Sequence, residues 1–524
     1  MPTAPPAPRQ GQFVINGPLY GPWPDLRAWN GRLPGPGRPA STPTVAALVG
    51  AVLVIAESLP LDRPGVGWLV SVVAAAIALL VARPVTGGPP PLVTRPAPGT
   101  RWDQYAWGAA TIALLGVGTF RAAGWLFALC VATAALTSAL ALGGGRSMRA
   151  VLTTYAISFF AVLYALPWLG RGLTRIRRKS GDGPAPIRIA GTAAASVVLL
   201  AVFGLLFASA DPAFARLSES LIPEIGVGSA FRWIFLAVLA TPVLAGALYL
   251  RVAPPHLADL DQTEGGKVSR LEWAVPLGLL TLLFAAFVTV QLAVLFGGER
   301  HVLTTAGLTY AEYARGGFWQ LCFVIGLTLV VLAGAARWAP REAPGDRAVF
   351  RCVLGALTLL TLVIVASALV RMQVYIDTYG LTRLRLLVAC CELWFGVVLL
   401  MVLAAGIRIR APWLPRAAIA VGVLALIGLA VANPDLRIAR NQLDRPADRV
   451  DVRYLSGLSP DAVPALTGID DPDDRFCVLN TISLGMGGNE WREWNLGRAT
   501  ARDLIGDRPR PVNLYQCEAS RFGY

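Results

Sequence analysis

The stretch LLVACCELWFGVVLLMVLAAG, residues 386–406, decides the class of fold. Its twenty-one residues contain one charged side chain, Glu392. A bilayer core about 30 Å thick is crossed by about 20 predominantly apolar residues in an α-helix. The stretch is therefore predicted to span a membrane. The segment that leads into it, YIDTYGLTRLRLL (375–387), holds two tyrosines, an aspartate and two arginines, which a membrane span would not be expected to carry.

The whole chain has the composition of a membrane protein. It has 524 residues, of which 55% are hydrophobic and 15% charged, against about 25% charged in soluble domains. Windows of span length predict an all-α integral membrane protein with about twelve transmembrane helices, and a count of eleven to thirteen is compatible with the pattern. The predicted spans are 44–60, 66–82, 105–120, 122–142, 150–169, 189–209, 232–250, 273–296, 317–336, 350–370, 386–406 and 415–432.

Three regions follow from the distribution of apolar residues. Residues 1–43 form a Pro/Gly-rich N-terminal arm that we expect to be disordered, and no cleavable signal is visible in it. Residues 44–432 form the polytopic transmembrane helical domain. Residues 433–524 form a small polar tail domain, predicted to be mainly helical from the segments NPDLRIARNQL, SPDAVPAL and NEWREWNLGRATARDL.

Basic residues in the loops predict the orientation of the chain. The loop 171–188 carries six basic residues, and the alternate loops after it on the same side are also rich in Arg. The positive-inside rule places these loops in the cytoplasm and the tail outside the cell. The first half does not agree, because five spans before 171–188 would put the arm outside. Either one early span is miscounted or the rule fails there.

The cysteines divide between the spans and the tail. Five lie in apolar spans, where a thiol is usually a small hydrophobe. Cys477 and Cys517 lie in the tail. An extracytoplasmic tail is in an oxidising compartment, so the two are predicted to form a disulfide.

The loop 371–386 is predicted to lie on the outer side, between two spans. Gly380 can end one helix and Thr382 can cap the next. Arg383 and Arg385 then fall in the first turn of a helix, where the macrodipole disfavours cations by about 0.3 to 1 kcal/mol. The positive-inside rule disfavours them on this face as well. We therefore expect a negative partner, and the candidates are Asp377, lipid phosphates, a carboxylate of another loop or a bound anionic ligand.

The loop 299–317 repeats the design and offers a carboxylate. Its Thr309 and Glu312 have the spacing of a capping box. Within the span, Glu392 lies seven residues beyond Arg385, about 10 Å deeper in the membrane, and is either a functional group or a structural one. The outer loops 299–317 and 371–386 are predicted to form a polar site. The ligand-binding or structural-lock candidates are Glu312, Tyr313, Arg315, Tyr375, Asp377, Tyr379, Arg383, Arg385 and Glu392.

Several of these segments carry a resemblance to a known family. LTYAEYARGGFWQL, YIDTYGLTRLRLL, NPDLRIARNQL, LSPDAVPAL and WNLGRATARDL resemble the multi-pass membrane family catalogued as domain of unknown function 4173, which is related to 4153. The resemblance covers roughly residues 270–505. It implies an integral protein of the bacterial cell membrane. It brings no established activity, catalytic residue or cofactor.

Familiar chemical signatures are missing from the sequence. The chain has two histidines and none of the common zinc-protease, nucleotide-binding or serine-hydrolase motifs. We expect no metal, no cofactor and no catalytic residue. The 46 basic residues are scattered between apolar runs, which argues against nucleic acid. The expected partners are the lipid bilayer and, at the outer loops, an anionic lipid headgroup or a small anionic solute. The sequence does not indicate an oligomeric state.

Three classes of function remain, in decreasing order of support. The first is a non-enzymatic membrane protein with a sensing, scaffolding or envelope-related role. The second is a secondary transporter, which Glu392 and the repeated loop design favour. The third is a membrane transferase that acts on a lipid-linked substrate, whose phosphate the outer arginines could bind.

Overall fold

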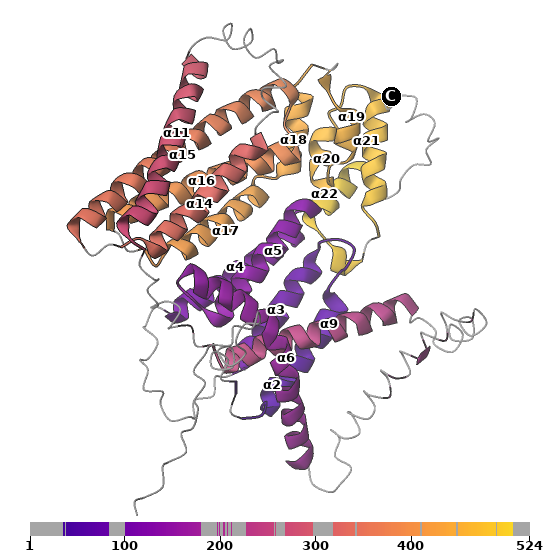
Figure 1. Cartoon of the computed structure of the whole chain (residues 1–524). Helices are drawn as coiled ribbons and strands as arrows, with labels where there is room; N and C mark the ends of the chain where they lie inside the picture. Colours follow the sequence, from indigo (N-terminus) through magenta and orange to yellow (C-terminus); the bar gives the residue numbers. More distant parts are fainter. Residues whose placement is uncertain are drawn as a thin grey trace, which may run out of the picture.

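The fold consists of two neighbouring groups of long helices and a cluster of short helices at one end (Figure 1). The computed structural model describes residues 35–82, 100–179, 227–257, 268–296, 318–340, 343–408, 411–446 and 449–506, with gaps at 37, 256 and 489, and isolated positions between 196 and 211. Every regular element in these ranges is an α- or 3-10 helix. The predicted all-α class is confirmed for this part of the chain.

All predicted spans except 189–209 coincide with a described helix, and that one falls outside the described residues apart from isolated positions. Within the described ranges, eight helices are long and apolar enough to cross a membrane, compared with about twelve predicted spans. The long helices are α2 (Thr42–Ser58), α3 (Val66–Val81), α4 (Thr100–Phe120), α5 (Gly124–Gly143), α6 (Met148–Lys179), α9 (Val227–Val252), α11 (Arg270–Phe296), α14 (Phe318–Trp338), α15 (Pro344–Tyr379), α16 (Arg383–Arg408) and α17 (Leu414–Val431). The qualifying eight are α5, α6, α9, α11 and α14 to α17; α2 and α3 are shorter apolar helices.

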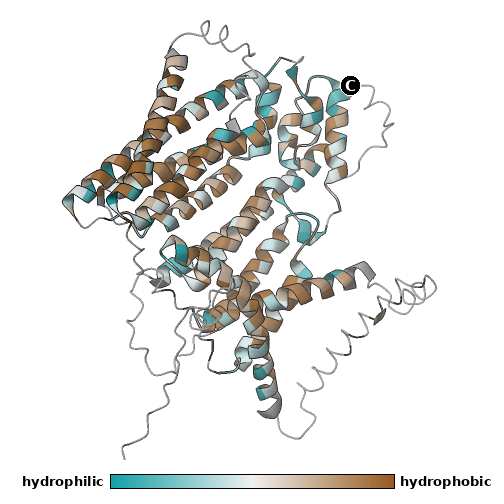
Figure 2. Ribbon diagram, viewed as in Figure 1, coloured by the Kyte–Doolittle hydropathy of each residue, from teal (hydrophilic) through white to brown (hydrophobic). Residues whose placement is uncertain are grey.

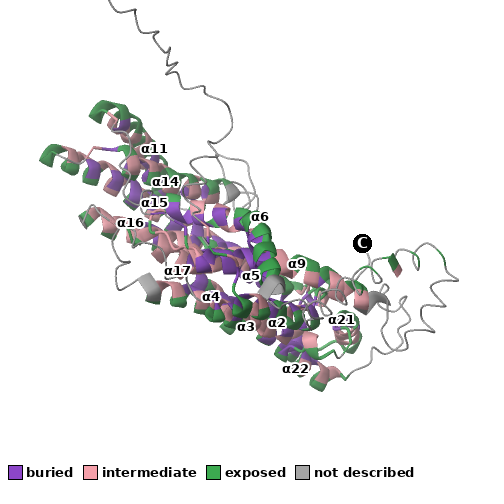
Figure 3. Cartoon of the chain, turned by 90° about the horizontal axis from the view of Figure 1, so that it is seen from below, coloured by how far each residue is buried: buried purple, intermediate pink, exposed green. Residues whose placement is uncertain are grey.

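Apolar side chains also cover the outside of these helices. The long helices are mostly hydrophobic, and hydrophilic residues gather in the short helices and at helix ends (Figure 2). On α11, Leu279, Leu282 and Leu283 are 63%, 67% and 64% exposed. Buried residues concentrate inside the bundle, between the helices (Figure 3). An apolar exterior on this scale is stable against lipid and not against water, so the chain is a multi-pass membrane protein.

The long helices form two packed groups with a connection between them. Helices α2, α3, α6 and α9 share one core around Leu48, Ile157 and Leu248. Helices α11, α14, α15 and α16 share another around Ile325 and Leu357. Helix α17 belongs to the second half of the sequence but packs against α4 and α5 in a third core. The two halves of the chain are thus joined through α17.

The short helices of the tail enclose a core of their own. They are α18 (Pro434–Leu443), α19 (Val452–Ser456), η2 (Pro460–Ala462), α20 (Val463–Leu466), α21 (Pro472–Gly485), η3 (Trp491–Glu493) and α22 (Leu496–Ile505). Ile438, Leu455, Leu466 and Val478 are fully buried in that core. The single helix predicted over 489–504 is wrong, because the chain is extended at Trp494 and a new helix begins after Asn495.

The membrane domain has two distinct ends. We call the end whose helix turns contact the tail the tail side, and the other end the opposite side. The turns α2–α3, α4–α5 and α15–α16 lie on the tail side. On the opposite side, Arg416 at the start of α17 donates to the carbonyl of Gly145 after α5 (2.6 Å) and binds Asp103 near the start of α4 (2.8 Å).

Helix α6 differs from its neighbours in direction. Near its start, the Thr154 hydroxyl donates to the carbonyl of Gly144 (3.2 Å), just beyond α5. Fourteen residues further along, the Trp168 indole donates to the carbonyl of Arg38 (3.0 Å), just before α2. Both contacts are on the opposite side. In Figure 1, α6 crosses α9 rather than running alongside α15, α16 and α17.

Candidate functional site

The turn between α15 and α16 requires a glycine. Gly380 has φ +79°, and a Cβ there would lie 2.6 Å from the side-chain nitrogens of both Gln442 and Arg445 of the tail. Thr382 follows, and its hydroxyl accepts a hydrogen bond from the backbone N–H of Arg385 (3.4 Å). Helix α16 then begins at Arg383. The cap places both arginines in its first turn, against the tail.

Arg383 binds a carboxylate of the tail with two parallel hydrogen bonds. Its Nε and Nη2 donate to Oδ1 and Oδ2 of Asp435 at 3.1 and 2.5 Å. Asp435 lies in the first turn of α18 and is fully buried, whereas the Arg383 side chain is 32% exposed. The backbone N–H of Arg383 donates to the hydroxyl of Tyr454 (2.7 Å). A bidentate pair of this kind fixes the orientation of both groups.

Asp435 joins three parts of the chain. Besides Arg383, it accepts hydrogen bonds from the indole of Trp125 in α5 (3.1 Å) and from the backbone N–H of Ser459 (2.9 Å). Burial disfavours its charge, but the hydrogen bonds and charge of Arg383, with the Ser459 hydrogen bonds, hold the pKa of this carboxyl below its ordinary value. Asp435 is therefore an ionised group at the meeting point of α5, α16 and the tail.

Arg385 is held by its own turn. Its guanidinium donates to the carbonyls of Tyr379 (2.9 Å) and Gly380, and it lies over the ring of Tyr375, 4.2 Å from the centroid. Asp377, the carboxylate of the preceding helix end, is exposed and accepts from Gln373 instead (3.0 Å). It therefore does not serve as the partner proposed for the arginines.

A second tail carboxylate caps a membrane helix. Oδ2 of Asp461 accepts from the backbone N–H groups of Ala122 and Ala123, at 2.7 and 3.0 Å, at the start of α5. The Ser459 hydroxyl donates to the same oxygen (3.2 Å), and Oδ1 is buried with no hydrogen-bond partner. Burial raises the pKa of Asp461 to about 6, although the two backbone hydrogen bonds oppose the shift.

The tail also binds the α4–α5 and α2–α3 turns near Asn495. The amide of Asn495 donates to the carbonyl of Gly118 (2.6 Å), and its oxygen accepts from the backbone N–H of Arg498 (3.2 Å). The guanidinium of Arg498 donates to the carbonyl of Pro64 (2.6 Å). Burial lowers the pKa of Arg498 to about 10. Three helix turns are thus bound by tail side chains.

Two ion pairs strengthen the contact with the α2–α3 turn. Arg63 pairs with Glu493 (3.4 Å) and Arg492 with Glu57 (3.7 Å). These pairs are partly exposed, and such pairs contribute little to stability. The rings of Trp491 and Trp494 are 52% and 43% exposed beside them.

Glu392 lies apart from these contacts, in the middle of the bundle. Its side chain is fully buried. The Cys322 thiol of α14 donates to Oε1 (3.0 Å), while Oε2 has no hydrogen-bond partner. Nine residues separate Glu392 from Arg383, which is about 13 Å along the helix. Glu392 therefore does not belong to the Arg383 cluster.

Other predicted residues fall outside the described part of the chain. These are Glu312, Tyr313, Arg315 and Cys517. Cys477 is buried and disulfide-bonded. Its pairing with Cys517 stays a prediction. In the described residues, no group of three His, Cys, Asp or Glu side chains could hold a metal ion.

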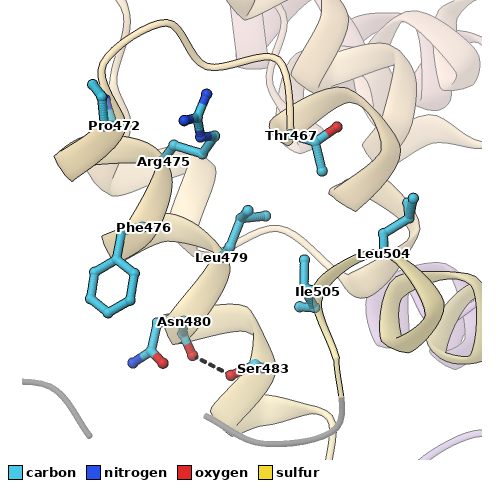
Figure 4. Close-up of a pocket in the computed structure, with 9 residues that line it drawn as sticks. All are labelled: Thr467, Pro472, Arg475, Phe476, Leu479, Asn480, Ser483, Leu504 and Ile505. Carbon is cyan, nitrogen blue, oxygen red and sulfur yellow. Dashed lines mark hydrogen bonds between the residues drawn. The ribbon is translucent and has the colours of Figure 1, made fainter. Parts of the chain in front are cut away.

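The tail contains a shallow pocket between α21 and α22, with a volume of about 410 Å³ (Figure 4). Two of its polar side chains, Arg475 and Ser483, donate to backbone carbonyls of the tail itself. None of the tail side chains described above as binding a helix turn lines it. The pocket gives no indication of a ligand.

We call the group formed by Arg383, Asp435, Trp125, Ser459 and Asp461 the docking network. Of these residues, the sequence-based site prediction included only Arg383. It also missed Tyr454 and Asn495. The sequence offered one signal, the Asp in the first turn of the helix that follows the last span. No spacing rule connects it to an arginine 52 residues earlier or a tryptophan 310 residues earlier.

Comparison with known proteins gives one match. The sequence matches the family described as Domain of unknown function (DUF4153) over residues 109–469, which is more than half of the chain. This range includes the α4–α5 and α15–α16 turns and every residue of the docking network. No curated protein and no solved structure matches the chain.

Proposed function

This chain belongs to the DUF4153 family, and we propose that it is a non-enzymatic scaffold or sensor of the membrane, in which the docked tail holds the two halves of the membrane domain in one arrangement. Asp435 carries the proposal, since it binds Trp125 of the first half and Arg383 of the second half at once. A change in tail docking would alter both halves together. The loop motifs further support a closer kinship with the family numbered 4173.

The polar site of this proposal is a structural lock rather than a ligand site. Both oxygens of Asp435 are used, and the two outer arginines are bound to Asp435, to backbone carbonyls and to an aromatic ring. An arginine engaged in this way is a poor receptor for a phosphate, because binding would first have to break the existing contacts. This argues against the transferase alternative.

The setting that we propose is the bacterial cell membrane, with the tail outside the cytoplasm. The basic loops from 171–188 onward support this orientation. The disulfide at Cys477 supports it as well, because disulfides persist in oxidising compartments. In that orientation the lock faces the envelope, where a scaffold or sensor would meet its stimulus.

The test is to break the lock and to compare this with a substitution that keeps the cation. Arg383→Ala should make the tail sensitive to protease in proteoliposomes and lower the melting temperature. Arg383→Lys should retain part of both properties, because its ammonium can still pair with Asp435, whose hydrogen bonds from Trp125 and Ser459 are untouched. Arg440→Ala is the matched control, since this arginine is exposed on the same tail helix as Asp435.

The alternative is a ligand site, and it makes a different prediction. If Arg383→Ala keeps a protease-resistant tail and an unchanged melting temperature, but loses binding to vesicles that contain phosphatidylglycerol, the lock is wrong. Arg383 would then be a receptor for an anionic headgroup.

A secondary transporter is the second candidate, and the unpartnered Oε2 of Glu392 favours it. A buried carboxyl within a helical bundle is a common site for a coupling ion or proton. In proteoliposomes loaded with a pH-sensitive dye, a proton-coupled carrier would move protons, and Glu392→Gln would abolish the movement. Glu490→Gln, on the exposed surface of the tail, is the control. No proton movement by the unmodified protein would leave the scaffold as the better account.

A further inference from the structure

We propose that α6 does not cross the membrane but lies in its interface, with one face in the lipid leaflet on the opposite side. Two anchors, fourteen residues apart on α6, carry the proposal. Thr154 binds Gly144 at the end of α5, and Trp168 binds Arg38 before the start of α2. Gly144 and Arg38 are both on the opposite side. A helix that crossed the bilayer between these points would have to end on the tail side.

Neighbouring contacts place the rest of α6 in the same half of the bundle. Gly172 fits against Ala40, where an added Cβ would lie 2.7 Å from the Ala40 side chain. The Trp168 ring meets the ring of Tyr249, near the end of α9, with centroids 5.9 Å apart. The end of α9 is also on the opposite side, since Arg251 donates to the carbonyl of Leu79 near the end of α3. Helix α6 therefore runs across the ends of α2 and α9.

The two faces of α6 are both apolar, but one packs on other helices and the other is exposed. One face is buried against α2 and α9 and includes Ile157, Ala161, Ala165 and Trp168. The other exposes large apolar side chains at intervals of three and four residues. These are Leu152 (61% exposed), Tyr155 (51%), Phe159 (76%), Leu163 (65%) and Leu166 (49%).

Basic residues at both ends of α6 specify where this stripe lies. Arg146 and Arg149 stand at its start, and Arg171 and Arg175 are exposed at its end. Arginines at headgroup level with apolar side chains between them fit a helix parallel to the membrane plane. In a crossing helix, one of the two basic ends would have to lie on the tail side. Lipid acyl chains of the opposite-side leaflet are thus the partner that the stripe fits.

The proposal also removes the conflict in the orientation of the first half. Helices α2 to α5 make four crossings, so the chain returns to the side on which the arm begins. With α6 in the interface, Arg38 before α2 and the basic residues Arg171 and Arg175 of α6 lie on one side. The described basic residues of the first half then agree with the positive-inside rule. On this proposal, the segment predicted as the span 150–169 lies along the membrane, although its length and hydropathy would also allow a crossing.

Membrane depth distinguishes the two arrangements sharply. Leu152 and Leu166 are fourteen residues apart, which is about 21 Å along a helix. Spin labels at Leu152→Cys and Leu166→Cys, in the full chain in vesicles, report depth through their collisions with oxygen and with a water-soluble nickel complex. We expect depths within about 5 Å of each other and high oxygen accessibility. A difference close to the full helical distance would overturn the proposal.

Two further measurements on the full chain test on which side of the membrane the ends of α6 lie, and whether lipid or another copy of the chain covers its exposed face. A membrane-impermeant maleimide should label Arg146→Cys and Arg175→Cys from the same side of the membrane. Arg347→Cys marks that side, and Glu490→Cys marks the other. The modified sites are mapped by mass spectrometry. Labelling of the first two from different sides contradicts the proposal. Low oxygen accessibility with spin–spin coupling at Phe159→Cys would show a second copy, rather than lipid, on the stripe.

Discussion

The two sides of the membrane domain are held together by different kinds of contact. On the tail side, helix turns are bound by buried groups such as Asp435 and Asp461, which are 0% and 3% exposed. On the opposite side, the ion pairs are more open: Asp103 is 45% exposed in its pair with Arg416, and Arg270 is 51% exposed in its pair with Asp346. Charged contacts gain strength and become costly to break as they lose water. The tail side should therefore dominate stability.

The largest expected effect is on the buried pair. Asp435→Ala removes the carboxylate and leaves Arg383, Trp125 and the Ser459 N–H without their acceptor. Breaking a buried pair costs 3 to 5 kcal/mol, and partial exposure of Arg383 reduces this to about 2 to 4 kcal/mol. Thermal unfolding in detergent measures it. Asp435→Asn keeps the shape and should lose less; equal losses would show that charge is irrelevant there.

The next effect depends on pH and on Asp461. Its pKa is raised to about 6 in the folded protein, so its stabilising contribution is fully present below the ordinary pKa of about 3.8 and is lost as pH rises through 6. Docking of the tail should strengthen by about 1 to 3 kcal/mol between pH 7.5 and pH 4.5. Melting temperatures across this range measure it.

Asp461→Asn is the control for this dependence. Its amide oxygen can still accept from Ala122 and Ala123, but it does not titrate. The profile of melting temperature should become flat between pH 4.5 and 7.5. A dependence that survives the substitution would assign it to another group.

A smaller effect is expected on the opposite side. Arg416→Gln removes the ion pair with Asp103 and the hydrogen bond to Gly145. Since Asp103 is well exposed, we expect a loss of about 0.5 to 1.5 kcal/mol in the free energy of unfolding. A loss as large as that of Asp435→Ala would cancel the difference between the two sides.

The smallest effect is expected at Glu392, midway between the two sides. Glu392→Gln keeps the acceptor for the Cys322 thiol and replaces an oxygen that has no partner. The free energy of unfolding should change by less than about 1 kcal/mol, because no strong interaction is removed. A loss above 2 kcal/mol would reveal an ionic partner for this carboxyl.

Much of the membrane domain could be predicted from hydropathy. Stretches such as 386–406 and 415–432 reappear as α16 and α17, because the need to satisfy backbone groups in lipid acts on each segment separately. The cap at Thr382 was also visible, since capping depends on adjacent residues. The single helix predicted over 489–504 failed at Trp494, whose carbonyl accepts a hydrogen bond from Val66 of the membrane domain. A tertiary contact interrupts the helix there.

The sequence by itself determined the class of fold, most of the helices, and the need for a negative partner near Arg383. Each of these depends on interactions within about twenty residues. Only the tertiary structure decided that the partner is Asp435 and that α5 and α16 meet there, because a carboxylate can bind any arginine that the fold brings to it. Hydropathy also has the same value for a helix across a membrane and for one along its surface. The direction that we propose for α6 relative to the membrane therefore depends on its contacts with α2, α5 and α9.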